Sequence, residues 1–417
     1  MQKEISKSLL LLSVLFILSS SVISCQKKTK EQATTLSEKE SIVVGANQTE
    51  AYLDLLKGKR IAIAANNTSV IFKSDDNQSN QHLVDSLLSL NIKIEKIFTP
   101  EHGLRGTVDA GEIINNEIDE KTGIQIVSLY GDNNNDTSNK FKPTKEQLEN
   151  IDLVVFDIQD VGVRFYTYLS TMHYIMEACA ENGIPVIVLD RPNPNGHYID
   201  GPIVENEFKS FVGLHPVPIV YGMTIGEYAK MINGEKWLNN GVQCDLTVIP
   251  LKNYTHKSTY SLPFRPSPNL PNDKSINLYA SICMFEGTNV SCGRGTEMQF
   301  QIFGSPDLPS DIYKFNFTPQ PNFGSKNPKN MGQVCHGLDL SKTENLSSLN
   351  FNWLIDAYKA TSDKDKFFKE KSFNILAGTG KLKEQIERGL TFEDIKATWQ
   401  DDLSEFKKIR EKYLIYP

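Results

Sequence analysis

Short apolar runs alternate with longer amphipathic segments from residue 60 onward, and this alternation constrains the fold more than any other feature. The runs have the length and composition of buried strands, and the segments between several of them have helical periodicity. Such alternation predicts an α/β fold with a doubly wound parallel sheet. The expected strands are residues 60–65, 93–99, 125–130, 153–158 and 185–190, and the expected helices are 81–90, 144–149 and 168–182.

The character of the sequence changes after residue 200, where prolines become frequent. We therefore predict one domain at 42–200 and a second, mixed α+β domain at 201–417. The second domain ends in segments of helical character, one of which starts at Thr391, a natural N-cap. Its expected elements are a helix at 224–233, a strand at 245–251, and C-terminal helices at 352–361, 381–388 and 391–413.

Residues 1–24 have the features of a secretory signal peptide. Two lysines precede an apolar run at 9–18, which is too short to span a bilayer. The Val-Ile-Ser-Cys sequence that ends at Cys25 resembles the cleavage and lipidation box of bacterial lipoproteins, although an ordinary signal with a chance cysteine is the alternative. Acyl chains on Cys25 would hold the protein to a membrane. We expect an exported, membrane-anchored lipoprotein at the periplasmic face, with residues 25–41 as a flexible tether.

Charge and cysteine spacing exclude several classes of partner. The formal net charge is -7, which argues against binding to nucleic acid. The six cysteines form no CxxC pair and have no zinc-like spacing, and a disulfide between Cys283 and Cys292 stays open. The nucleotide-binding GxxxxGK[ST] motif, the GxSxG motif of serine esterases and the HExxH motif of zinc proteases are absent, and no GxGxxG follows the first strand. We expect neither a cofactor nor a metal ion.

Polar side chains follow several of the expected strands. Ligands of open parallel sheets bind outside the carboxyl ends of the strands, so these side chains are candidates for a site. They include an acid, an imidazole, guanidinium groups, phenols and amides, which together are typical of a hydrolase. The candidates are Glu101, His102, Arg105, Tyr130, Gln159, Asp160, Arg164, Tyr166, Arg191 and Asn193.

Glu101 is the candidate general acid, because partial burial at the end of a strand would raise its pKa into a useful range. The alternative is that Glu101 caps a helix or pairs with Arg105. His102 is expected either to orient Glu101 or to bind a ligand, or else to act only as a hydrogen-bonding partner.

Arg164 and Arg191 are candidates to clamp a substrate carboxylate. The alternative is that they brace Asp157, Asp160 or Asp190. A glycine-rich segment of the second domain adds three further candidates for substrate binding, although its arginine could instead pair with Glu297. These three residues are Glu286, Asn289 and Arg294.

At these residues the chain resembles the NamZ-type exo-β-N-acetylmuramidases, a glycoside hydrolase family. Individually the matching blocks are short, but their joint order over residues 42–417 is specific. The blocks are residues 98–106, 157–168, 190–194, 201–202, 266–271, 285–288, 293–296 and 399–400.

The resemblance implies a Rossmann-like first domain and a smaller second domain that completes a cleft with it. It implies release of terminal β-linked N-acetylmuramic acid from peptidoglycan fragments, with Glu101 as the leading catalytic residue. Muramic acid carries a lactyl carboxylate, and we expect one of the arginines to bind this carboxylate in the site.

The second catalytic group stays open. Asp160 and Glu286 are the candidate carboxylates, and the substrate's own 2-acetamido group is a third possibility. Two other functions also stay open: a non-catalytic sugar-binding lipoprotein, and a metal-dependent phosphoesterase with Glu101, His102, Asp157 and Asp160 as ligands.

Overall fold

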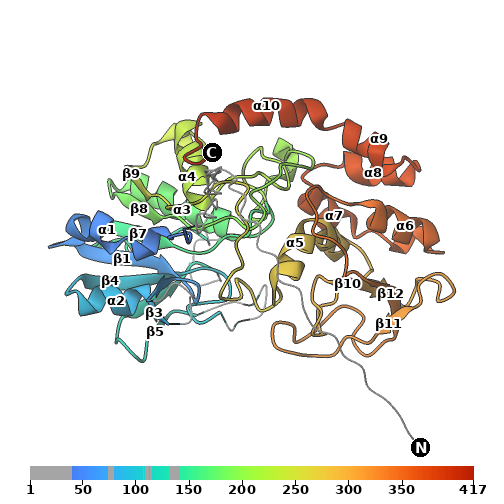
Figure 1. Ribbon diagram of the computed structural model, residues 1–417, viewed down its shortest axis with the longest axis horizontal. Coiled ribbons are helices and arrows are strands. Elements are labelled where there is room, and N and C mark those ends of the chain that lie inside the picture. Colours follow the sequence, from blue (N-terminus) through green and yellow to red (C-terminus); the bar gives the residue numbers. More distant parts are fainter. Residues whose placement is uncertain (1–39, 74–78, 107, 109–111, 113–114, 131–140) are drawn as a thin grey trace, which may run out of the picture. The chain divides into compact units, whose positions relative to one another are not determined.

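A seven-stranded sheet organises the first half of the chain (Figure 1). The strands lie in the order β5-β6-β4-β1-β7-β8-β9, and all are parallel except β5, which pairs antiparallel with β6. They are β1 (Arg60–Ala65), β4 (Lys93–Thr99), β5 (Glu117–Ile118), β6 (Gln125–Ser128), β7 (Leu153–Asp157), β8 (Val186–Leu189) and β9 (Leu246–Ile249).

This computed structural model describes residues 40–73, 79–106, 108, 112, 115–130 and 141–417. The predicted signal peptide and Cys25 lie outside the described residues. Within those ranges, no helix is both long enough and apolar enough to cross a membrane.

The order of the parallel strands confirms the doubly wound sheet. Numbered along the chain, the six parallel strands lie in the order 3-2-1-4-5-6, which is the Rossmann arrangement. The strand order reverses between β1 and β7, and the loops that follow these strands and β4 leave the sheet at its carboxyl edge. Ligands bind at this edge in folds of this kind.

Helices cover both faces of the sheet, because alternate residues of each strand point to opposite faces. Ile61 and Ile63 of β1 belong to one apolar cluster with α1 (Thr49–Leu56) and α2 (Leu83–Ser89). Ala62 and Ala64 belong to the other cluster, with α3 (Tyr168–Glu181) and α4 (Ile225–Gly234).

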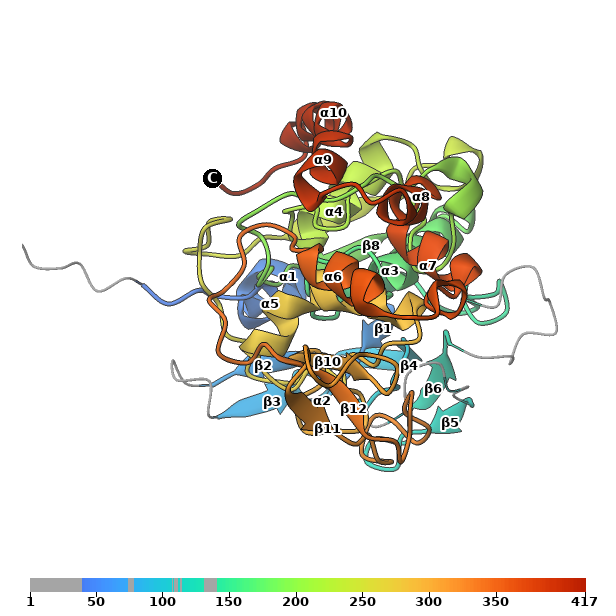
Figure 2. The same cartoon turned by 90° about the vertical axis from the view of Figure 1, so that its right-hand side faces the viewer.

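The second half of the chain contains a small antiparallel sheet and most of the remaining helices (Figures 1 and 2). The sheet has the order β10-β12-β11, and α6 lies beside it. Its strands are β10 (Ile302–Ser305), β11 (Phe315–Phe317) and β12 (Cys335–Asp339). The helices are α5 (Asp273–Ile282), α6 (Asn352–Ala360), α7 (Glu370–Ala377), α8 (Lys381–Glu387), α9 (Phe392–Ala397) and α10 (Gln400–Glu411).

The first half adds a hairpin of β2 (Val70–Phe72) and β3 (Asn80–His82). The chain also has short 3₁₀ segments at Gly45–Asn47, Asn206–Phe208, Asn239–Gly241, Cys283–Gly287 and Lys364–Lys366.

Two expected helices differ from the structure. Residues 144–149 form turns, although Thr144 and Gln147 accept hydrogen bonds from each other's backbone amides as at the start of a helix, because the left-handed Asn150 (φ 62°) ends the segment after about one turn. The expected helix at 391–413 is broken between α9 and α10. There the indole of the buried Trp399 donates a hydrogen bond of 3.1 Å to Asp200 Oδ1.

The strand expected at 245–251 forms as β9, but it pairs with β8 at the edge of the main sheet. The main sheet therefore includes chain from both sides of the predicted boundary at residue 200. Residues 41–417 cluster as one compact unit.

A buried carboxylate joins this edge of the sheet to the end of the chain. Asp190 Oδ1 accepts hydrogen bonds from the backbone amides of Arg191 and Gly226, and its Oδ2 accepts from the hydroxyls of Thr224 and Tyr416. Burial raises the pKa of Asp190 to about 6 in spite of these donors. The loop after β8, the start of α4 and the C-terminal tail thus share one carboxylate.

Candidate active site

A cavity of about 350 Å³ lies where the loops after β4 and β7 meet α5 and the segment that follows α5. Its position matches the carboxyl edge at which a site was expected. The cavity is lined by aromatic side chains and a small number of charged and polar groups, as is usual for small-molecule sites. The predicted residues that line it are Glu101, His102, Tyr130, Tyr166, Glu286 and Arg294.

Glu101 is held by groups from two other segments. Its Oε2 accepts a hydrogen bond of 2.8 Å from the hydroxyl of Thr167, the N-cap residue of α3. Burial raises the pKa of Tyr130, and the charge of Glu101 and a hydrogen bond with it raise that pKa further. Thr167 thus places the carboxyl group of Glu101 beside the N-terminus of α3.

His102 is fixed by contacts at both ring nitrogens. Nδ1 lies 2.6 Å from the carbonyl oxygen of Val108, and Nε2 lies 3.1 Å from the hydroxyl of Ser267. Its backbone has a φ of 74°, in the left-handed region that residues other than glycine rarely occupy. Such strain persists where the surrounding contacts enforce it. The structure thus supports the reading of His102 as a hydrogen-bonding partner that orients the loop of Glu101.

Glu286 is the second carboxylate of the cavity. Arg294 Nε donates to Glu286 Oε1 at 2.9 Å, and the thiol of Cys292 contacts the same oxygen. Burial alone would raise the pKa of Glu286, but the positive charges of Arg294 and Lys329 hold it at about 2. Glu286 is therefore ionised at neutral pH. The alternative pairing of Arg294 with Glu297 does not form.

Asp160, the other candidate carboxylate, lies outside the cavity lining. Its Oδ2 accepts hydrogen bonds from the amide of Gly162 and from the hydroxyl of Tyr221. The side chain is buried, and burial raises its pKa to about 6. The structure therefore brings Glu286, and not Asp160, to the same cavity as Glu101.

Arg191 braces the sheet instead of lining the cavity. Its Nε and Nη2 donate to the two carboxylate oxygens of Asp157 at 2.6 and 2.9 Å, and both side chains are buried. Gln159 and Asn193 also support the loops, because their side-chain amides donate to the carbonyls of Pro192 and Met223.

Arg164 is buried and binds backbone carbonyls only. Nη1 donates to the carbonyls of Pro202 and Val217, and Nη2 donates to those of Leu376 and Ala377, at distances between 2.7 and 2.9 Å. Burial lowers its pKa to about 9. Arg164 therefore ties the loop after β7 to the end of α7.

Arg105 and Asn289 also lie outside the cavity lining. Arg105 pairs with Asp119 at 2.8 Å, and the Asn289 amide donates to Asp307 at 2.9 Å. Of the predicted arginines, Arg294 alone lines the cavity.

Three residues that line the cavity, Thr167, Phe141 and Phe211, were not predicted from the sequence. Thr167 lies inside one of the matching blocks, so its position was visible but its role was not. Phe141 and Phe211, whose rings stack 3.7 Å apart at the cavity, come from segments without any motif. Only the fold brings these two rings beside Tyr130.

The described cysteines and metal-ligating residues form no further centre. Cys179, Cys244, Cys283, Cys292 and Cys335 are free and buried, so the possible disulfide between Cys283 and Cys292 is not formed. In the ranges that the structure describes, no three His, Cys, Asp or Glu side chains are grouped so that they could hold a metal ion.

Comparison with known proteins decides the family. One family model, the N-terminal part of exo-beta-N-acetylmuramidase NamZ, matches residues 61–274, and the model of the C-terminal part matches residues 277–416. The chain belongs to the NamZ family. The division between the two family models falls just after the start of α5.

Individual members of the NamZ family agree with this assignment. The chain is 41% identical over 384 residues to the peptidoglycan beta-N-acetylmuramidase NamZ of Bacillus subtilis strain 168, which covers 88% of this chain and 89% of that protein. Crystal structures of two DUF1343 family proteins from Bacteroides fragilis NCTC 9343 each cover 90% of this chain and 99% of their own. They match with TM-scores of 0.81 and 0.76 at 46% and 28% identity.

The contrast between two arginines that were both predicted to bind substrate can be tested. Replacing Arg191 by Met leaves the buried Asp157 without a cation, so we expect the free energy of unfolding to fall by about 3–5 kcal/mol. Arg105→Met breaks a pair whose arginine is 52% exposed and whose carboxylate, 7% exposed, keeps the hydrogen bond from the Thr122 hydroxyl, so the loss should be smaller, about 1–2 kcal/mol. Urea denaturation measures both values. Equal losses of unfolding free energy in the two variants would contradict a larger contribution of the Arg191–Asp157 pair to stability.

Proposed function

We propose that the protein is an exo-acting glycoside hydrolase that releases terminal β-linked N-acetylmuramic acid from peptidoglycan fragments, with Glu101 as the general acid/base. One observation carries the proposal: Glu101 and the ionised Glu286 line the same cavity, in a chain of the NamZ family. Glycosidases place two carboxyl groups about the scissile bond in this way.

Glu101 has the surroundings of a proton donor. Cleavage of a glycosidic bond requires a proton on the leaving oxygen, and a positioned side chain supplies it most effectively. The hydrogen bond from Thr167 fixes the carboxyl group of Glu101 at the cavity. After the bond is cleaved, the same carboxylate can take a proton from the attacking water.

Glu286 supplies a fixed negative charge. The transition state of glycoside hydrolysis carries positive charge near the anomeric carbon, which a carboxylate in the cavity stabilises. Two routes use this charge: direct attack by the carboxylate, or orientation of the substrate's 2-acetamido group for attack. The hydrogen bond that Glu286 accepts from Arg294 favours the second route, because it makes the carboxylate a weaker nucleophile.

Arg294 is the proposed partner of the lactyl carboxylate. Its Nε is used by Glu286, whereas in the described part of the chain its two terminal nitrogens make no hydrogen bond within the protein. The guanidinium carbon lies 5.1 Å from the centre of the Phe300 ring, which limits the directions that the group can take. A bidentate contact with a carboxylate would satisfy the two terminal nitrogens.

The role of Glu101 predicts a dependence on the leaving group. Glu101→Gln should lower kcat/KM by about 10²–10⁴-fold on the disaccharide of N-acetylmuramic acid and N-acetylglucosamine. The loss should be smaller on para-nitrophenyl β-N-acetylmuramide, because nitrophenol leaves without a proton. Chromatography and nitrophenol absorbance measure the two rates.

Glu297→Gln is the matched control for Glu101→Gln, because Glu297 is exposed and lies outside the cavity. It should leave both rates unchanged. A folded wild-type protein without turnover would contradict the muramidase function and favour a sugar-binding protein. Equal losses on both substrates would contradict the acid role.

The role of Arg294 predicts a change in specificity. Arg294→Lys keeps a cation beside Glu286 but removes the planar fork, so the ratio of kcat/KM for the nitrophenyl muramide to that for the nitrophenyl N-acetylglucosaminide should fall by about tenfold or more. Arg265→Lys, at an exposed position outside the cavity, is the control. An equal loss on both sugars would point to a general effect on the cavity.

We also propose that the protein is exported and anchored by lipid on Cys25. The signal-like residues 1–24 and the lipidation box support this proposal. With Cys25→Ser, the protein should move from the membrane fraction to the soluble fraction. Retention in the membrane fraction would contradict lipid attachment at Cys25.

A further inference from the structure

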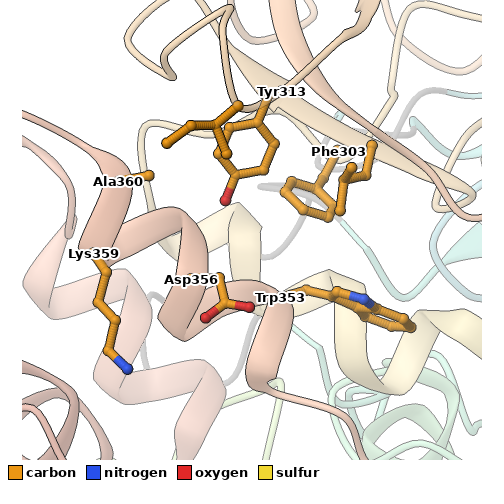
Figure 3. Close-up of a pocket in the computed structure, with 8 residues that line it drawn as sticks. Phe303, Tyr313, Trp353, Asp356, Lys359 and Ala360 are labelled. Carbon is orange, nitrogen blue, oxygen red and sulfur yellow. The ribbon is translucent and has the colours of Figure 1, made fainter.

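A second cavity, of about 490 Å³, lies between α6 and the small antiparallel sheet (Figure 3). It shares no lining residue with the cavity of Glu101. Its volume is in the range of small-molecule sites. Phe303, Ile312, Tyr313 and Leu338 line it on one side, and Trp353, Asp356, Lys359 and Ala360 of α6 line it on the other.

The α6 side of this cavity is one face of a helix. Trp353, Asp356 and Ala360 follow one another at spacings of three and four residues, which places them in line along the helix. The opposite face of α6 is buried in the core through Leu354 and Ile355. The core therefore fixes the helix and the face that it turns to the cavity.

Aromatic side chains form the walls. Phe303 is fully buried and Trp353 is partly exposed. Figure 3 shows their rings on opposite sides of the cavity. The Phe303 ring stacks on the ring of Phe285, so the partly exposed indole of Trp353 supplies the accessible π-face, together with a hydrogen-bond donor at its edge.

Polar groups in the cavity lack partners within the protein. Tyr313 is only 4% exposed, yet in the described part of the chain its hydroxyl makes no hydrogen bond. Figure 3 shows this hydroxyl directed toward the α6 side, where Asp356 lies. This hydroxyl is not one of the buried polar atoms that lack a partner, so water reaches it, and a ligand in the cavity can take the place of that water.

The other polar groups at the cavity are also available. Among the described contacts, the side chains of Trp353, Asp356 and Lys359 make no hydrogen bond or ion pair, although Asp356 and Lys359 are three residues apart on one helix. The charges of Asp356 and Lys359 cancel, so the entrance of the cavity carries no formal net charge. The cavity therefore favours a ligand that is neutral, has an apolar face and carries both donors and acceptors.

We propose that this cavity is a second, non-catalytic saccharide site that takes an N-acetylhexosamine unit. The C–H face of the sugar ring packs on Trp353, and the acetamido methyl group packs against Ile312 and Leu338, which line the cavity and are accessible. Hydroxyl or amide N–H groups of the sugar donate to Asp356, and its oxygens accept hydrogen bonds from Tyr313. The chemistry of the cavity carries this inference independently of turnover at Glu101.

Other occupants match these groups less well. An acyl chain would fill the apolar part but would cover the Tyr313 hydroxyl without offering it a hydrogen bond. A short peptide with free charged ends would pair with Asp356 and Lys359 but would not pack on the ring of Trp353. A saccharide uses both parts of the cavity. If the proposed function holds, such a site would keep the enzyme on a glycan chain between cleavage events.

The test is titration of the full chain with triacetylchitotriose, which contains N-acetylhexosamine units but no muramic acid. Binding is followed by tryptophan fluorescence, since Trp353 is one of three tryptophans and Trp399 is buried. We expect a saturable change, with Kd raised about fivefold by Tyr313→Phe through the loss of one hydrogen bond. Calorimetry should show a loss of about tenfold or more in Trp353→Ala.

Tyr358→Phe is the matched control, because Tyr358 lies on α6 but does not line the cavity. It should leave the Kd unchanged. Binding that Tyr313→Phe and Trp353→Ala leave unaltered would overturn the proposal. So would the absence of saturable binding, or binding of trialanine in place of the saccharide with the same dependence on Trp353. Tyr313→Phe removes one atom, so its result stands even if Trp353→Ala fails to fold. The titration requires no turnover, so its failure is distinct from failure of the muramidase assay.

Discussion

The buried ion pair of Asp157 and Arg191 holds together the edge of the sheet on which the site depends. Asp157 ends β7, and Arg191, the second residue after β8, also donates to the carbonyl of Val70, the first residue of β2. A buried pair is costly to desolvate, and it is tolerated because both charges are fully paired. The loop that begins at this pair leads to Thr167, which fixes Glu101. The position of Glu101, the proposed general acid, thus depends on a contact that lies outside the cavity.

The polar residues at this edge have two different tasks. Glu101, Glu286 and Arg294 face the cavity, whereas Asp160 and Arg164 bind the protein itself. The second group gives the loops a rigid backbone, since each of its members satisfies several buried groups at once. Rigid support of this kind keeps reacting groups in place within a fraction of an ångström.

The parallel strands could be predicted, because apolar runs report buried strands, and the cavity lies at the carboxyl edge that the strands share. For Arg191 the sequence left open both a contact with substrate and bracing of Asp157, and the structure has the second; the four backbone partners of Arg164 were not predicted. Whether an arginine meets a ligand or a carbonyl depends on partners such as Leu376, which is 212 residues from Arg164. The break before Trp399 was missed for the same reason, since the residue is held by Asp200 from a distant segment. Phe141 and Phe211 carry no local signal at all.

The shared carboxylate of Asp190 has a consequence for the order in which the chain folds. Residue 190 leaves the ribosome long before residue 416, yet the hydroxyl of Tyr416 is one of its partners. Until that tail docks, the edge of the sheet beside β9 holds a buried acid that lacks one of its donors. The native surroundings of Asp190 are therefore complete only once the tail has docked, so the α/β half of the molecule depends for part of its stability on a residue of the C-terminal tail.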